Sequence, residues 1–101
     1  MPAYLIAIVN VHDAERFREY RERVTGLIEQ HGGRYLVRGG RMEVLEGDWS
    51  PPRVAIIEFP DREAAQAFYD DPAYEPLRSL RQAVTTSDLL LVEGVTDPRS
   101  R

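Results

Sequence analysis

The order in which strand-like and helix-like segments follow one another constrains the fold of this chain most strongly. Short runs rich in branched apolar residues, or alternating polar with apolar ones, predict strands at residues 3–11, 34–38, 53–59 and 88–93. Helical spacing of apolar residues fills the gap after the first strand and the gap after the third. The sequence therefore predicts the order β-α-β-β-α-β, in which two halves of similar length follow each other.

The first helix is the best-defined element of this order. Asp13 is placed to cap its start, and Gly32 and Gly33 are placed to end it. Between them an apolar stripe recurs at the spacing of a 3.6-residue helix. The stripe consists of Phe17, Tyr20, Val24, Leu27, Ile28 and His31. One face of this helix is therefore expected to pack on the sheet.

The second helix is expected to be interrupted. Asp61 is placed to cap it, Asp71-Pro72 breaks it, and helical spacing resumes from Tyr74 to Val84. A long connection over residues 39–52 joins the two central strands. Met42 to Leu45 inside it is an alternative continuation of the second strand, beyond a bulge at the paired glycines.

Length and composition limit the classes of protein that fit. The 101 residues suit a single domain over 1–94, followed by a loose tail over 95–101. The net charge of −4, with arginines interleaved among glutamates, argues against a nucleic-acid partner. No cysteine is present, which excludes thiolate chemistry and cysteine metal sites. The apolar start is too short to span a membrane and does not resemble a signal peptide, so a cytoplasmic location is expected.

The element order predicts an α+β domain of the ferredoxin-like type. Its four-stranded antiparallel sheet would carry both helices on one face. The first, third and fourth strands are nevertheless apolar on both of their faces, and two helices cover only one. A second apolar face of this size is normally buried, so we expect a homodimer that forms through this sheet face. The alternative is that the C-terminal tail folds back over it.

Several motifs, in order along nearly the whole chain, resemble a known family. They are DAERFREY (13–20), HGGRYLVRGG (31–40), VLEG (44–47), RVAIIEFP (53–60), AFYDDPAY (67–74), Leu80-Arg81 and LLLVEG (89–94). The chain resembles the dimeric α/β-barrel superfamily and, within it, the small bacterial domain-of-unknown-function family thirteen-thirty. The resemblance implies the ferredoxin-like fold and a sheet-to-sheet dimer. The wider superfamily includes cofactor-independent monooxygenases, haem-degrading enzymes, dehydratases and muconolactone isomerases, often with a pocket between sheet and helices.

Three polar residues in or next to apolar strands are candidate catalytic groups. Asn10 is either hydrogen-bonded to a neighbouring loop or an amide that orients a substrate carbonyl. His12 follows the first strand and is a candidate base at a pocket mouth. Glu58 is expected near Arg34 in a simple hairpin register, on the face that also holds Arg38. It is either an ion-pair partner there or a carboxylate base with a raised pKa.

The long connection and the second helix supply candidate binding residues. Arg38 and Arg41 flank two glycines and are placed either to grip a carboxylate or to form surface ion pairs. Trp49 is either a lid over a pocket or an anchor in the dimer. Tyr69 and Tyr74 are either core residues or part of a cavity wall.

Arg81 lies on the apolar side of the second helical region. A buried guanidinium needs an anion, and Glu58 and Asp88 are its candidate partners. The two histidines stand about 28 Å apart along the first helix, at 1.5 Å per residue, so no metal site is expected within one subunit. No bound cofactor is expected either.

Two classes of function fit these residues. The first is an enzyme or binding protein for a small apolar organic acid or phenolic compound. Its pocket would lie where the first strand meets the first helix and would be lined by Asn10, His12, Arg38, Glu58 and Tyr69. The second is a non-catalytic homodimer that serves as a structural or partner-binding module, because each candidate residue also has a structural explanation. The fold analogy by itself does not decide between them.

Overall fold

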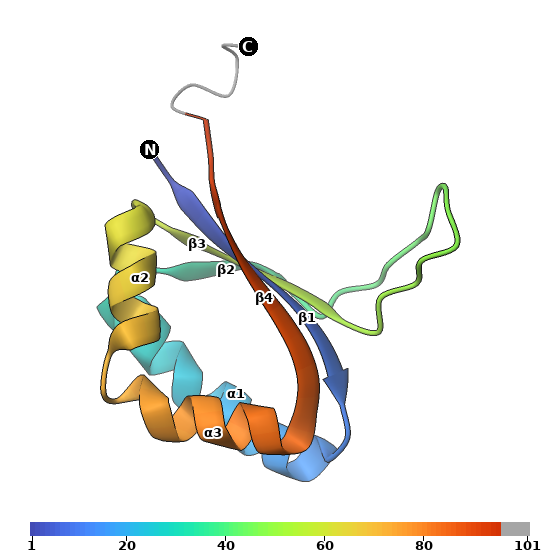
Figure 1. The fold of residues 1–101 in the computed structure, drawn as a ribbon, viewed down its shortest axis with the longest axis horizontal. Coiled ribbons are helices and arrows are strands. Elements are labelled where there is room, and N and C mark those ends of the chain that lie inside the picture. The colour runs from blue at the N-terminus through green and yellow to red at the C-terminus, as the bar shows by residue number, and fades with distance from the viewer. Residues whose placement is uncertain (96–101) are drawn as a thin grey trace.

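A computed structural model describes residues 1–95, which form one four-stranded sheet with three helices on one side of it (Figure 1). The strands are β1 (Ala3–Val11), β2 (Arg34–Arg38), β3 (Val54–Phe59) and β4 (Thr85–Glu93). The helices are α1 (Ala14–Gln30), α2 (Arg62–Asp70) and α3 (Tyr74–Val84). The predicted ferredoxin-like α+β fold is confirmed. The tail predicted over 95–101 lies outside the described residues from 96 onward.

The sheet is antiparallel, with its strands in the order β2-β3-β1-β4. β1 pairs with β3 from Ala3 opposite Phe59 to Ile8 opposite Val54. On its other side β1 pairs with β4 along its whole length. β1 is therefore a central strand, as its continuous apolar sequence requires.

β4 begins at Thr85 and not at Asp88, so the predicted start of this strand is wrong. α3 ends at Val84, and the chain enters the sheet with no loop between them. Thr85 and Thr86 already pair with the end of β1. Threonine is β-branched and suits extended backbone, which explains why these polar residues extend the strand.

The helix ends follow the predicted capping. The Asp13 carboxylate accepts a hydrogen bond from the backbone N–H of Arg16 at 3.2 Å. The Asp61 carboxylate accepts one from the backbone N–H of Ala64 at 2.8 Å. The break at Asp71 separates α2 from α3, so the second helical region of the sequence is two helices in the structure.

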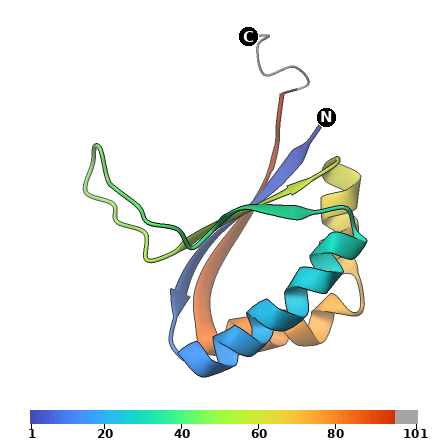
Figure 2. The same ribbon diagram turned by 180° about the vertical axis from the view of Figure 1, so that it is seen from behind.

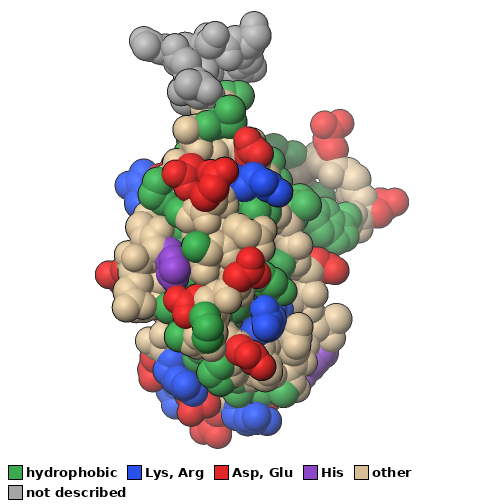
Figure 3. Space-filling view, turned by 60° about the vertical axis from the view of Figure 1, so that its left-hand side comes forward, with side chains coloured by type: hydrophobic (Ala, Val, Ile, Leu, Met, Phe, Trp, Pro, Cys, Tyr) green, Lys and Arg blue, Asp and Glu red, His purple; other side chains and the backbone are tan. Residues whose placement is uncertain are grey.

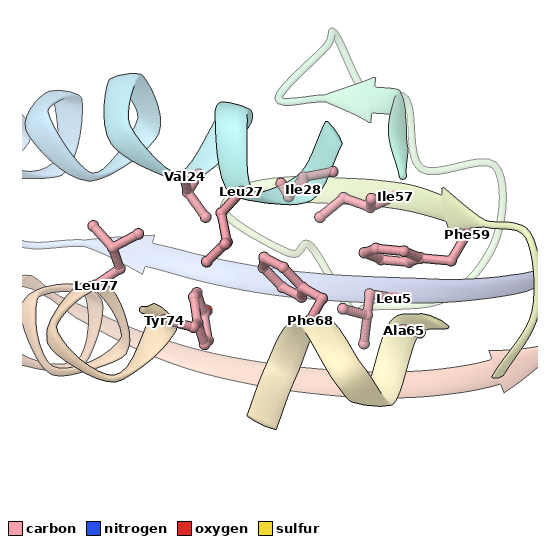
Figure 4. Packing of buried hydrophobic residues seen from close by; sticks show 10 residues of the cluster. All are labelled: Leu5, Val24, Leu27, Ile28, Ile57, Phe59, Ala65, Phe68, Tyr74 and Leu77. Carbon is pink, nitrogen blue, oxygen red and sulfur yellow. The ribbon is translucent and has the colours of Figure 1, made fainter. Parts of the chain in front are cut away.

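The main core lies between the sheet and the helices and is centred on aromatic rings (Figure 4). Phe68 of α2 is 2% exposed. Its ring centroid lies 4.7 Å from that of Tyr74 and 5.5 Å from that of Phe59. Aromatic pairs at these separations add to the free energy of burial. This cluster holds α2 and α3 against β1 and β3.

β2 contains a bulge that changes which way its side chains face. Its register on β3 shifts between Tyr35 and Val37. After the shift Arg38 pairs with Ala55, on the same side of the sheet as Tyr35. The prediction that Arg34 and Arg38 share a face is therefore wrong, because the inserted residue reverses the alternation. Arg38 faces the helices and Arg34 faces away from them.

The connection over residues 39–52, here called the arm, projects away from the rest of the domain (Figure 2). Met42 to Leu45 is not a strand in the structure. The arm nevertheless exposes large apolar side chains: Leu45 is 86% exposed and Trp49 is 67% exposed. Both side chains are free to contact another molecule.

The face of the molecule drawn in Figure 3 is mixed in charge. Acidic and basic side chains are scattered among apolar ones on this face. No helix within residues 1–95 combines the length and apolar character needed to cross a membrane.

Candidate functional site

A cavity lies between the helix-facing side of the sheet and helices α1 and α3. Its volume is about 50 Å³. The floor is apolar and comes from three strands: Leu5, Ala7, Val9, Ala55, Ile57 and Leu89. These residues face the helices because they occupy alternate positions of their strands. The rest of the cavity lining consists of aromatic rings and arginine guanidinium groups.

Three arginines, here called the rim arginines, stand together at one part of this wall: Arg21, Arg38 and Arg53. Arg38 is exposed, whereas the other two are half-buried. Aromatic rings support all three. The guanidinium carbon of Arg53 lies 5.5 Å from the ring centroid of Phe17, and that of Arg21 lies 5.8 Å from the same ring. The guanidinium carbon of Arg38 lies 4.6 Å from the ring centroid of Tyr35.

The rim arginines lack a balancing anion. Among the described residues, no Asp or Glu lines the cavity, and no ion pair involves a rim arginine. Burial, aided by repulsion from Arg21 and Arg38, lowers the pKa of Arg53. The Arg21 Nε atom is buried without a hydrogen-bond partner. Buried donors normally have a hydrogen-bond acceptor, so the Arg21 Nε–H is available to an acceptor on a ligand.

Two tyrosines and a fourth arginine form a second polar group in the wall. The Tyr20 and Tyr74 hydroxyls are 2.9 Å apart and hydrogen-bonded to each other. The Arg81 Nε donates a longer bond of 3.4 Å to the Tyr74 hydroxyl. Tyr74 is 1% exposed and Arg81 is 5% exposed. All three residues line the cavity.

Gly39 at the base of the arm keeps Arg53 in place. Its φ of +68° lies in the left-handed region, which glycine adopts without strain. A side chain here would collide with the Arg53 guanidinium. The bulge of β2 and this glycine together let two arginines from neighbouring strands meet at the rim.

Of the predicted site residues, Arg38, Tyr74 and Arg81 line the cavity. The predicted partners of Arg81 are wrong. Glu58 pairs with Tyr4, and Asp88 pairs with Ile8. These positions alternate with the cavity floor, so both carboxylates lie on the sheet face that points away from the helices.

The three candidate catalytic residues lie outside the cavity. The Glu58 carboxylate accepts a hydrogen bond from Arg34 Nε at 2.9 Å, which confirms the cross-strand ion pair. The His12 Nε2 atom is 2.7 Å from the Thr86 hydroxyl. Asn10 is exposed at the end of β1, where it lines a shallow groove beside the arm. Catalytic roles for these residues stay predictions.

The remaining candidates lie on the arm and on α2. Arg41 and Trp49 are exposed along the arm. Tyr69 lines a separate hollow between α2 and the strands β1 and β4, together with Leu5 and Leu91. There the guanidinium of Arg78 stands 5.1 Å from the centroid of the Tyr69 ring.

The prediction of one pocket that gathers all five polar candidates is wrong. Those residues were Asn10, His12, Arg38, Glu58 and Tyr69, and Arg38 alone lines the cavity. Glu58 lies on the opposite sheet face, Asn10 and His12 lie at the end of β1, and Tyr69 lines the separate hollow between α2 and the sheet. A pocket does lie between the sheet and the helices, but most of its lining side chains are not those that the sequence analysis proposed.

Four cavity residues with polar groups were not among the candidates: Tyr20, Arg21, Tyr35 and Arg53. The sequence places Tyr20 on the apolar stripe of the first helix, and Arg21 lies four residues after Phe17 beside that stripe. Arg53 directly precedes an apolar strand. A search for cations at the margins of apolar faces would have found Arg21 and Arg53.

Within residues 1–95, no group of three or more His, Cys, Asp or Glu side chains is arranged to hold a metal ion. The guanidinium groups of the cavity are hydrogen-bond donors only and do not ligate cations, whereas the tyrosine hydroxyls both donate and accept. The arrangement is suited instead to an anion or to an oxygen acceptor attached to an apolar body.

Comparisons with known proteins place the chain in a family and in a fold. The model of the family described as "Domain of unknown function (DUF1330)" matches residues 2–95. A protein of unknown function from Rhodopseudomonas palustris is 23% identical, with a TM-score of 0.77 over 95% of this chain and 84% of that one. Among curated proteins, none matches the chain.

Two structures of enzymes share the fold at lower identity. SnoaB, a cofactor-independent oxygenase from Streptomyces nogalater, is 14% identical, with a TM-score of 0.63 over 96% of each chain. An antibiotic biosynthesis monooxygenase is 15% identical, with a TM-score of 0.57 over 97% of this chain and all of that one (100%). These similarities establish the fold. Any chemical role has to be argued from the residues of the cavity.

Proposed function

We propose that this chain, which belongs to the family of unknown function DUF1330, binds or converts a small apolar organic acid or phenolic compound in the cavity. One observation carries the proposal. Four guanidinium groups line a cavity with an apolar floor, and no carboxylate among its described lining residues balances them. Burying charge without a partner costs free energy. An anionic ligand with an apolar body supplies the missing partner and fills the space.

The size of the cavity bears on the size of the ligand. A volume of about 50 Å³ exceeds that of a single bound water but is tight for an aromatic ring. Within residues 1–95 the rim arginines make no ion pair. Arg38 is exposed, lies over the Tyr35 ring and donates a hydrogen bond to the Thr25 hydroxyl at 3.2 Å. We expect the long side chains of the rim arginines to swing outward as the ligand enters and then to close on its carboxylate.

The described cavity lining favours ligand binding over catalytic conversion, because it lacks the usual general bases. It contains no carboxylate and no histidine. Glu58, one of the two candidate bases of the sequence, is engaged by Arg34 on the other sheet face. The fold shared with SnoaB, an oxygenase, supports a small-molecule role without assigning a reaction.

A homodimer in the cytoplasm is part of the same proposal. The sheet face away from the helices exposes apolar side chains, with Leu90 58% and Val92 38% exposed. A second copy is the occupant we propose, because a two-fold interface needs a surface that is complementary to itself. The apolar face and the apolar arm give one chain both parts of such a surface. The non-catalytic alternative of the sequence analysis needs the same dimer.

Sedimentation equilibrium tests the dimer. We expect a dimer for the unmodified chain and a monomer for Leu90→Arg, because the new charge would be buried in the interface. Gln82→Arg, on the exposed side of α3, is the matched control and should stay dimeric. A monomeric unmodified chain would refute this part of the proposal.

Isothermal titration calorimetry with benzoate and benzamide tests the ligand class. The two molecules have nearly the same shape, and only benzoate is charged. Benzoate should bind at least about tenfold more tightly, because hydrogen bonds to a charged group are worth about 1.5–3 kcal/mol. Arg21→Met should remove most of this preference. Arg23→Met, exposed on the same helix, should retain it. Equal affinity for both molecules would contradict the proposal.

A further inference from the structure

We infer that Tyr20, Tyr74 and Arg81 form an oxyanion site within the cavity, which takes a phenolate or enolate oxygen of the ligand. The inference rests on the proposed function and deepens it. The rim arginines take the carboxylate, and the oxyanion site takes a second oxygen on the same molecule. The ligand class is then an acid that also carries a phenolic or enolic hydroxyl.

A count of hydrogens supports this site. The Tyr20 and Tyr74 hydroxyls have two hydrogens between them, and their mutual bond of 2.9 Å uses one. The other hydrogen has no acceptor among residues 1–95, whichever tyrosine donates. Arg81 contributes Nε–H to the Tyr74 oxygen and makes no ion pair in the described part of the chain. The group therefore has one hydroxyl hydrogen more than its own oxygens accept.

Burial keeps the Tyr20 hydroxyl in its donating form. Burial raises the pKa of Tyr20 far above its usual range, and the neighbouring Tyr74 raises it further. Tyr20 therefore stays protonated, and its hydroxyl donates at every ordinary pH. Arg81 carries its charge nearly shielded from water, at 5% exposed. An ionised oxygen gains more from such donors than a neutral one does.

The site is held by two helices and not by loops. Tyr20 belongs to α1, whereas Tyr74 and Arg81 lie two turns apart on one face of α3. The Tyr74 ring packs on Phe68, with centroids 4.7 Å apart, and the Tyr20 ring stacks on Phe17 at 5.7 Å. Because the rings are fixed by packing, the donors are in place before a ligand arrives.

The chemical consequence is a lowered pKa of the bound ligand. Hydrogen bonds and a nearby cation favour the charged form of an acid. A phenol in this site should ionise at a lower pH than the same phenol in water. We expect its ionisation constant to rise at least about tenfold, which is one pKa unit.

The test uses 4-nitrophenol, whose phenolate is yellow and whose phenol is nearly colourless. The probe is titrated with pH in the absence and presence of saturating protein, and the absorbance gives its pKa in each case. Tyr20→Phe, Tyr74→Phe and Arg81→Met should each reduce the downward shift of the probe pKa. Tyr69→Phe, outside the cavity, is the matched control and should leave the shift unchanged. Circular dichroism checks that each variant is folded.

The outcomes separate this inference from the proposed function. A bound probe with an unshifted pKa would overturn the oxyanion site while benzoate binding still upheld the function. A shift abolished by Arg21→Met but not by Tyr74→Phe would place the oxygen at the rim and also overturn it. Failure of both 4-nitrophenol and benzoate to bind would overturn the proposed function itself.

Discussion

Replacing Arg53 with methionine should weaken ligand binding with little effect on the empty protein. Two contributions to stability oppose each other in the empty cavity. The guanidinium lies over the Phe17 ring, a contact worth about 0.5–1 kcal/mol. Burial and the two neighbouring rim arginines disfavour its charge, as its lowered pKa indicates. Methionine retains much of the apolar stem, so the free energy of unfolding should change by less than about 1 kcal/mol.

The substitution should have a larger effect when ligand is present, and that effect should always be a loss of affinity. Loss of a charge-assisted hydrogen bond, worth about 1.5–3 kcal/mol, should weaken benzoate binding about 10- to 100-fold. Benzoate at about 100 times its dissociation constant should stabilise the unmodified chain by about 2.7 kcal/mol. The same concentration should stabilise the Arg53→Met variant by only about 0.4–1.4 kcal/mol.

Thermal unfolding with and without benzoate, at a fixed protein concentration, measures both effects. One kcal/mol corresponds to about 4–8 °C in Tm for a domain of this size. The variant should therefore match the unmodified chain without benzoate and fall clearly below it with benzoate. An equal rise in Tm for both proteins would refute the role of the rim arginines. So would a variant that loses several kcal/mol without ligand.

Three further predictions concern the core, the helix break and the arm. Phe68→Ala should cost about 3–5 kcal/mol in urea unfolding, because the ring is buried at 2% exposed; a cost below about 1 kcal/mol would contradict its central place. A hydrogen bond from the backbone N–H of Ala73, followed by one from His31, lowers the pKa of Asp71. The ionised Asp71 carboxylate therefore stabilises the fold above its unfolded pKa of about 4, and this stabilisation is lost as the pH falls below that value. Asp71→Asn should therefore reduce the loss of stability between about pH 5 and pH 2, and an unchanged pH dependence would argue otherwise. Gly39→Ala should cost about 1–2 kcal/mol through its positive φ and weaken benzoate binding by displacing Arg53; unaltered affinity in calorimetry would disprove that coupling.

The fold was predictable because local signals agree along most of the chain. The caps at Asp13 and Asp61, the apolar stripe of the first helix and the break at Asp71 all act within a few residues. The strand faces of β1, β3 and β4 likewise follow from simple alternation. Where two local signals conflict, as at Thr85 with its polar neighbours directly after a helix, the pattern gave the wrong strand start.

The site was only partly predictable, because one inserted residue changes the side of the sheet on which a side chain lies. Regular alternation put Arg38 beside Arg34, and the bulge in β2 puts it in the cavity instead. Glu58 was placed correctly beside Arg34 because no bulge intervenes before that pair. The meeting of Arg21 with Arg53 depends on how α1 crosses the sheet, which no short-range pattern encodes.

A crystal structure with 4-bromobenzoate tests the central claim most directly, because anomalous scattering from bromine locates the ring without ambiguity. We predict the bromine between the sheet and the helices, with the carboxylate in contact with guanidinium groups of the cavity. Bromine found only beside the arm, in the hollow of Tyr69 or on the open sheet face would contradict the account.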